Sequence, residues 1–81
     1  MAKKKAKENR KLVWVEVDSS QIEAVAYKGE VLYMRFNSGA VYSYDPVDEE
    51  AYNGLLNAES VGSYFSKYIK SDKTIKVEKI S

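Results

Sequence analysis

Residues 31–46 read VLYMRFNSGAVYSYDP, and this stretch has the pattern of a β-hairpin. Two runs rich in β-branched and aromatic residues, 31–36 and 40–44, flank the polar residues 37–39, which include a glycine. The pair Asp45-Pro46 follows, and proline cannot donate a hydrogen bond to a strand ladder. The stretch therefore predicts two antiparallel strands and a sheet that is interrupted at Pro46.

Two more strand-like runs precede this hairpin. Residues 12–17 and 22–27 are mainly apolar, and each is followed by a short polar connection, at 18–20 and 28–30. Short polar connections between such runs are typical of consecutive hairpins. The first half of the chain is therefore expected to be an antiparallel β-meander of about four strands.

The second half has helical features. Acidic residues 48–50 suit a first helical turn, and Tyr52, Leu55 and Leu56 recur at three- and four-residue spacing. Ser60 is the expected N-cap of a second helix. Residues 74–80 alternate weakly, so they form either an edge strand or a loose end. The predicted fold class is α+β: a meander of about four strands, two short helices and a possible C-terminal edge strand.

Composition excludes many functions. The chain has 81 residues, enough for one domain, and it contains no Cys and no His. Disulfides, thiolate or imidazole metal sites, Cys nucleophiles and Ser-His triads are thus impossible. We expect no enzyme, no metal and no cofactor. No apolar run approaches the roughly 18 residues of a membrane span, so we expect no membrane contact and a cytoplasmic location.

Charge is unevenly distributed. Residues 1–11 carry six basic side chains and one acidic one, a net +5, whereas residues 12–81 carry seven basic and 11 acidic ones, a net −4. We therefore predict a flexible basic tail over 1–11 and a single domain over 12–81. An acidic domain argues against a broad nucleic-acid surface, although a basic tail can contact nucleic acid nonspecifically.

Four motifs resemble those of the KTSC domain family. They are D-S-S-Q at 18–21, R-F-N-S-G at 35–39, Y-S-Y at 42–44 and S-V-G-S-Y-F at 60–65. The resemblance extends over residues 17–70 and implies a small stand-alone bacterial or phage protein, related to a C-terminal segment of some lysyl-tRNA synthetases and suggested to bind RNA. Two departures are the preceding basic tail and the C-terminal end, which lacks the family's tyrosine.

The hairpin leaves two placements open for Tyr42 and Tyr44, which alternate along one strand and share a face. With a two-residue turn at Ser38-Gly39, both tyrosines share an exposed surface with Arg35 and stack on bases. With a bulge at Gly39, the pairing slips by one residue and both tyrosines join the core.

Two further segments supply candidate ligands. The helix start at Ser60, Gly62 and Ser63 offers backbone N–H groups to an anion, and Lys67 lies four residues after Ser63. The alternative is a plain N-cap and a solvated lysine. We include Tyr64 of the same motif in the predicted site. The connector containing Ser19, Ser20 and Gln21 either offers hydroxyl and amide groups to a base or satisfies its own backbone.

These features predict a non-catalytic binding protein. The leading hypothesis is sequestration of a small signalling nucleotide, such as a cyclic dinucleotide, by a phage-encoded protein in the host cytoplasm that blunts a nucleotide-triggered defence. The alternative is an RNA or single-stranded nucleic-acid binding module that uses the basic tail. Because about 70 folded residues bury a small core, we also expect a homodimer or homotetramer.

Overall fold

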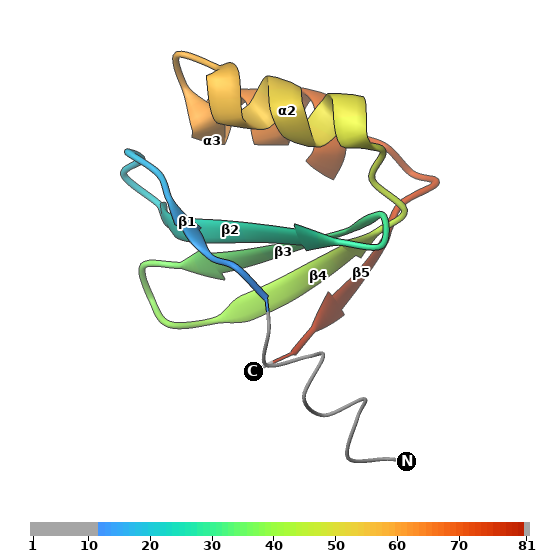
Figure 1. Cartoon of the computed structure of the whole chain (residues 1–81), viewed down its shortest axis with the longest axis horizontal. Helices are drawn as coiled ribbons and strands as arrows, with labels where there is room; N and C mark the ends of the chain where they lie inside the picture. Colours follow the sequence, from blue (N-terminus) through green and yellow to red (C-terminus); the bar gives the residue numbers. More distant parts are fainter. Residues whose placement is uncertain (1–11, 81) are drawn as a thin grey trace.

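The computed structural model describes residues 12–80, which form one five-stranded antiparallel sheet in the order β1-β2-β3-β4-β5. The strands are β1 (Val15–Glu16), β2 (Ile22–Lys28), β3 (Val31–Phe36), β4 (Val41–Asp45) and β5 (Lys76–Lys79). The helical segments lie together over one face of the sheet (Figure 1), and they are α2 (Glu49–Asn57), α3 (Val61–Tyr64) and the π-helix η1 (Phe65–Lys70). The predicted α+β fold is confirmed, including the edge strand. The predicted basic tail lies outside the described residues.

The first strand is shorter than predicted. We expected a strand over residues 12–17, but only Val15 and Glu16 pair with β2. The Val17 amide donates to the Glu23 carbonyl over 3.2 Å, next to an irregularity in β2 between Ile22 and Ala24. Regular pairing ends where β2 departs from an even ladder.

Gly39 sets the register of the β3–β4 hairpin. Its φ is +97°, in the region that favours glycine. The Gly39 amide donates to the Phe36 carbonyl over 2.8 Å, and the Phe36 amide donates to the Ala40 carbonyl over 2.9 Å. The loop therefore spans residues 37–39, which excludes the two-residue turn and confirms the bulged alternative.

This register decides which face each hairpin residue occupies. Leu32 lies opposite Tyr44, and Met34 lies opposite Tyr42. Both tyrosines therefore point to the helix-covered face. Arg35, one residue out of phase with Met34, points to the other face.

The core lies between the sheet and the helices. Tyr44 is 5% exposed, and its ring meets that of Phe65 edge-on with centroids 5.1 Å apart. The other buried apolar side chains of this cluster are Ile22, Val25, Leu32, Met34, Val47, Leu55, Val61 and Ile69.

Ser60 caps the second helix as predicted, and Asp48, which we placed in the first turn of the first helix, is the N-cap of α2. The Asp48 carboxylate accepts from the Ala51 amide over 2.8 Å, and the Ser60 hydroxyl accepts from the Ser63 amide over 3.2 Å. Acidic residues 48–50 are therefore explained by the start of α2. Over residues 12–80, no helix has the length and apolar character needed to cross a membrane.

Candidate functional site

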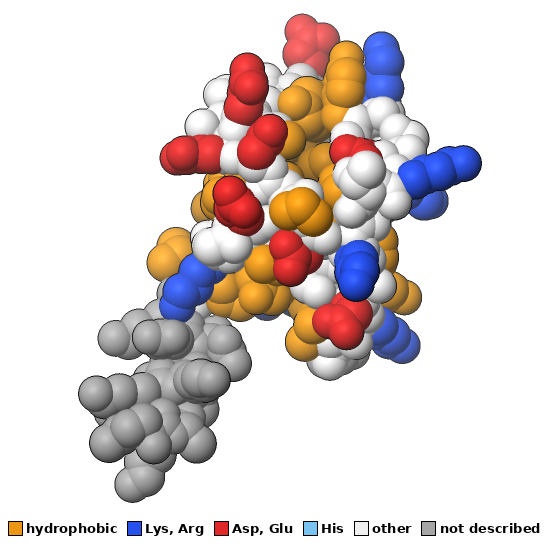
Figure 2. Space-filling model, turned by 90° about the vertical axis from the view of Figure 1, so that its right-hand side faces the viewer, with side chains coloured by type: hydrophobic (Ala, Val, Ile, Leu, Met, Phe, Trp, Pro, Cys, Tyr) orange, Lys and Arg blue, Asp and Glu red, His pale blue; other side chains and the backbone are white. Residues whose placement is uncertain are grey.

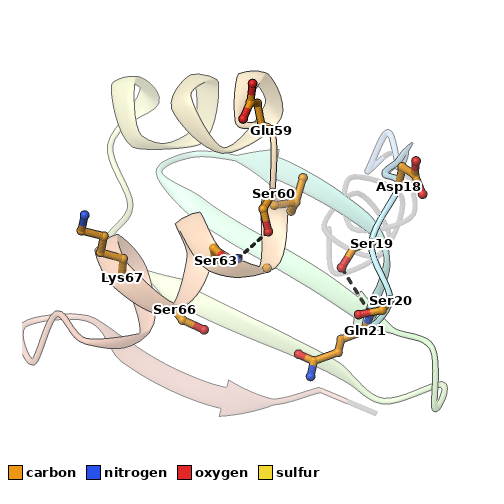
Figure 3. A pocket seen from close by; sticks show the side chains of 11 residues that line it. Asp18, Ser19, Ser20, Gln21, Glu59, Ser60, Ser63, Ser66 and Lys67 are labelled. Atoms are coloured by element: carbon orange, nitrogen blue, oxygen red, sulfur yellow. Dashed lines mark hydrogen bonds between the residues drawn. The ribbon is translucent and has the colours of Figure 1, made fainter.

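An open hollow of about 620 Å³ lies between the connector before β2 and the start of the second helix (Figure 3). Residues 18–21 form one wall, and residues from 59 to 67 form the other. We call it the serine hollow because five serines line it. Its volume falls within the roughly 300–1,000 Å³ of small-molecule sites.

Seven of the predicted site residues meet in the serine hollow, although they come from segments about 40 positions apart in the chain. They are Ser19, Ser20, Gln21, Ser60, Gly62, Ser63 and Lys67. A Cβ on Gly62 would lie 3.8 Å from Ser19 Oγ, so the two walls come close at this point.

Two of these serines hold the walls in shape. Ser19 Oγ accepts from the amides of Gln21 and Ile22 over 3.2 and 3.3 Å, and Ser60 Oγ is the N-cap acceptor. Both hydroxyls are thus engaged with backbone, as expected for a serine turn and a helix cap. They position the hollow, and each keeps a hydroxyl proton to donate.

Other polar groups of the hollow remain available to a ligand. Within residues 12–80, the hydroxyls of Ser20, Ser63 and Ser66 have no hydrogen-bond partner. The hydroxyl of Ser60 accepts from the Ser63 amide, and its carbonyl accepts from the Tyr64 amide. The first-turn amides of Val61 and Gly62 are therefore left for water or a ligand. The hollow therefore offers hydroxyl and amide donors.

The side chains that line the serine hollow carry a formal net charge of −1. Lys67 is its one lysine, and Asp18 and Glu59 are its two carboxylates. In Figure 3 the carboxylates of Asp18 and Glu59 point away from the floor between Ser60 and Ser19, and the Lys67 ammonium also points outward. The hollow's own hydroxyls and amides, rather than a cluster of cations, would make the closest contacts to an anion.

A second, more apolar hollow of about 690 Å³ adjoins the first. Its aromatic lining consists of Phe36, Tyr42, Tyr44 and Phe65, and Lys70 lies at its side. We call it the tyrosine hollow. Burial, with a smaller effect of neighbouring Tyr42, raises the pKa of Tyr44 to about 12, so this phenol stays protonated at neutral pH.

Gln21 and Ser66 line both hollows. In Figure 3 the Gln21 amide extends from the connector toward the helix that carries Ser66. The two hollows therefore form one groove with a polar end and an aromatic end.

Two predicted residues lie elsewhere. Arg35 is on the opposite face of the sheet, with its guanidinium carbon 4.7 Å from the Trp14 ring centroid and its Nε 3.5 Å from Glu23 Oε1. Tyr64 packs against Tyr68, with centroids 4.6 Å apart, and its hydroxyl fills the place where a Cβ of Gly54 would stand. Glycine is a poor helix former, but at position 54 of α2 its lack of a side chain makes room for the Tyr64 hydroxyl.

Ser66 was missed from the sequence, although it joins the two hollows. Gly62, Ser66 and Lys70 recur every four residues, which places them on one side of the helix. This stripe, which lacks apolar side chains, was the available signal. Phe36 and Phe65 were not among the predicted site residues either, and each contributes to the wall of the tyrosine hollow.

The fold and the groove define a small α+β domain whose candidate site is built from hydroxyls, amides and aromatic rings. The chain belongs to the KTSC domain family, whose family model matches residues 18–72. That match includes the whole serine hollow and ends before β5.

Individual relatives agree with this assignment. The chain is 36% identical over 58 residues to an uncharacterised protein of Stutzerimonas stutzeri, covering 69% of this chain and 82% of that protein. It is 41% identical over 56 residues to a protein of Tsukamurella paurometabola, covering 67% and 84%.

A solved structure is also similar. The crystal structure of a KTSC domain protein from Yersinia pestis has a TM-score of 0.78 and 28% identity, covering 86% of this chain and 99% of that one. The names of these three proteins mention neither a lysyl-tRNA synthetase nor a phage. The synthetase connection and the phage origin therefore stay predictions.

Proposed function

We propose that this chain is a non-catalytic binding protein that sequesters a small signalling nucleotide in the groove formed by the serine and tyrosine hollows. The observation that carries the proposal is that the two hollows share Gln21 and Ser66. A nucleotide has a polar phosphate and a flat apolar base, and the groove offers each a matching end. In its finer form, the proposal is that such sequestration blunts a nucleotide-triggered defence.

The charges of the groove favour a phosphodiester over a polyphosphate. Lys67 and Lys70 are its two lysines, while Asp18 and Glu59 lie at its rim. A triphosphate brings several negative charges to one place and would require a cluster of cations. A phosphodiester, as in a cyclic dinucleotide, carries one charge per phosphate, which hydroxyl and amide donors can bind.

Holding the ligand intact is the expected mode of action. A serine nucleophile needs an adjacent base, and within residues 12–80 no serine hydroxyl of the groove is hydrogen-bonded to a lysine or a carboxylate. This arrangement supports binding rather than turnover.

The test is a thermal-shift titration of the full chain with cyclic dinucleotides, larger cyclic oligonucleotides and cyclic ADP-ribose isomers. Binding to the native state raises Tm by mass action. A Tm rise with one cyclic nucleotide that is then released unchanged by heat would support sequestration. If the released nucleotide is cleaved, the chain is an enzyme, and if no cyclic nucleotide raises Tm, the proposal is wrong.

A matched pair of variants locates the site. Ser66→Leu fills the junction of the two hollows without removing a helix cap, and we expect it to abolish the Tm rise. Asn53→Leu makes the same kind of change at an exposed position of α2 and should leave the Tm rise intact. Equal responses from both variants would place binding outside the groove.

The alternative function, RNA binding, is favoured by Trp14. This ring lies against the Arg35 guanidinium on the face of the sheet away from the helices, just after the basic residues of the chain start. Aromatic rings beside cations bind single strands by stacking. On the face shown in Figure 2, however, carboxylates lie among the lysines and arginines, without a continuous basic stripe.

Replacing Lys3, Lys4, Lys5 and Lys7 by glutamine separates the two functions. RNA binding should then fall strongly, and in the unchanged chain it should weaken steeply with salt. Cyclic-nucleotide binding should change little. An affinity for cyclic nucleotides that depends on these lysines would contradict the proposed groove.

A further inference from the structure

β5 ends the sheet, and no described strand lies beyond it (Figure 1). All four of its residues are exposed. Two apolar side chains stand out at this end of the chain, since Val77 and Ile80 are each 53% exposed. An open edge that carries apolar side chains is a template for another strand.

The hydrogen bonds of β5 show which of its backbone groups face outward. The Ile80 amide donates to the Val41 carbonyl over 2.7 Å, so residue 80 points its backbone groups toward β4. In an antiparallel pair this orientation alternates along the strand. Glu78 and Lys76 therefore also face β4, whereas the N–H and C=O groups of Val77 and Lys79 face away from the sheet.

The side chains of β5 are self-complementary in one register. If two β5 strands pair antiparallel around Val77, the outward backbone groups of Val77 meet those of Val77 of the second copy. Lys76 then lies opposite Glu78 of the second copy, and Glu78 lies opposite Lys76, all on the same face of the sheet. Opposite charges placed across a strand pair stabilise it.

We propose that two copies of this chain dimerise through β5, with Val77 opposite Val77 and two reciprocal Lys76–Glu78 pairs. The interface is isologous, as a two-fold dimer requires, and it extends the sheet across both copies. It does not depend on the proposed nucleotide binding. Val77 also lines the tyrosine hollow, so the two tyrosine hollows would flank the seam.

Neighbouring registers lack this match. Centring the pair on Glu78 places the two Glu78 carboxylates opposite each other, and centring it on Lys79 does the same for two ammonium groups. Like charges directly opposite destabilise a pair. Lysines on an edge often prevent pairing, but here they alternate with a carboxylate and select one register.

Sedimentation velocity of the full chain over a concentration series tests the dimer. We expect a concentration-dependent dimer that Glu78→Lys converts to monomer. Lys76→Glu should also be monomeric. An equimolar mixture of the two variants should form a heterodimer, because each lysine then meets a glutamate. A chain that is monomeric at every concentration, or a wild-type dimer that Glu78→Lys leaves intact, overturns the proposal.

Amide hydrogen exchange gives a readout specific to this edge. The outward amides of Val77 and Lys79 should become protected as concentration rises, whereas those of Glu78 and Ile80 should be protected throughout. Protection of the Glu78 and Ile80 amides also shows that β5 remains in the sheet of each variant. This control is needed because Asp45 on β4 lies opposite Lys76, so Lys76→Glu places two carboxylates across that pair. In the Glu78-centred register, residue 78 of each copy meets residue 78 of the other, so Glu78→Lys would pair equally well with the wild type and with Lys76→Glu, which both keep Glu78. Equal affinity for these two partners would therefore overturn the proposed register, which predicts a clear preference for Lys76→Glu.

Discussion

The two faces of the sheet bury their residues by different means. On the helix-covered face, large side chains such as Leu32 and Met34 are fully buried under α2, α3 and η1. On the other face, Ala24 and Ala26 are equally buried, although in Figure 1 no described helix covers that side. These alanines lie opposite Arg35 and Tyr33 on β3.

The difference shows that complete burial does not by itself indicate a second layer. A methyl group is covered by the long side chains of its neighbours, whereas a leucine needs a facing element. The helix-covered face therefore supplies most of the hydrophobic stabilisation, and the other face remains open to solvent. The following variants test this contrast.

Leu32→Ala should produce the largest effect. It removes a fully buried side chain from the helix-covered face and leaves a cavity, which typically costs about 2–5 kcal/mol of unfolding free energy. Val31→Ala, one residue earlier and on the open face, should cost less than about 1 kcal/mol because its side chain is only partly buried. Urea unfolding measures both, and similar losses would contradict the contrast between the faces.

Gly39→Ala should produce the next effect, because Gly39 determines which residues reach each face. A Cβ at Gly39 meets nothing within 4 Å, so the cost comes from the backbone alone. With φ at +97°, we expect a loss of about 1–2 kcal/mol. Ser38→Ala, in the same exposed loop, is the control and should be nearly neutral. A tolerated Gly39→Ala would mean that the hairpin can adopt another register.

Much of the fold could be predicted because local signals agreed with the final structure. Ser60 caps its helix as its position indicated, the acidic residues 48–50 mark the start of α2, and the polar breaks at 28–30 and 37–39 separate the strands. The hairpin register could not be decided, since both turns suit Asn37-Ser38-Gly39 and only packing under the helices selects one. The extent of the first strand depended on an irregularity in β2 that leaves no clear trace in the sequence.

The candidate site was predictable in its parts but not in its assembly. The motifs at 18–21 and 60–65 indicated polar groups that turn out to line one hollow. Their meeting depends on how the second helix crosses the sheet, a long-range contact that no local pattern specifies. Arg35 was grouped with Tyr42 under the register that the structure excludes, and the hydrogen bonds around Gly39 place it on the opposite face.

Alkaline pH should reveal the burial of Tyr44 on the helix-covered face as a loss of folding stability. Below pH 10 this phenol is protonated in both the folded and the unfolded chain. Above pH 10 the unfolded chain ionises first, because burial raises the folded-state pKa of Tyr44 to about 12. Stability should therefore fall between pH 10 and 12, by on the order of 1 kcal/mol at pH 11 from this residue.

The Tyr44→Phe variant isolates that contribution. Burial also raises the pKa values of Tyr27 and Tyr52, so some loss of stability at high pH will remain in the variant. The difference in slope between wild type and variant, measured by urea unfolding at several pH values, reports on Tyr44. Identical slopes would show that the ring is not held in a desolvated position.

Arg35→Gln should have the smallest effect, because both side chains of its ion pair are partly exposed on the open face, although the Arg35 Nε atom itself is covered. The side chains of Arg35 and Glu23 are 33% and 49% exposed, and pairs at such positions contribute about 0–1 kcal/mol. The contact with Trp14 makes Trp fluorescence a local reporter, and Arg35→Lys should preserve a cation over that ring. A loss above about 2 kcal/mol in urea unfolding would mean that the open face is desolvated, and a covering partner would then have to be sought there rather than at β5 alone.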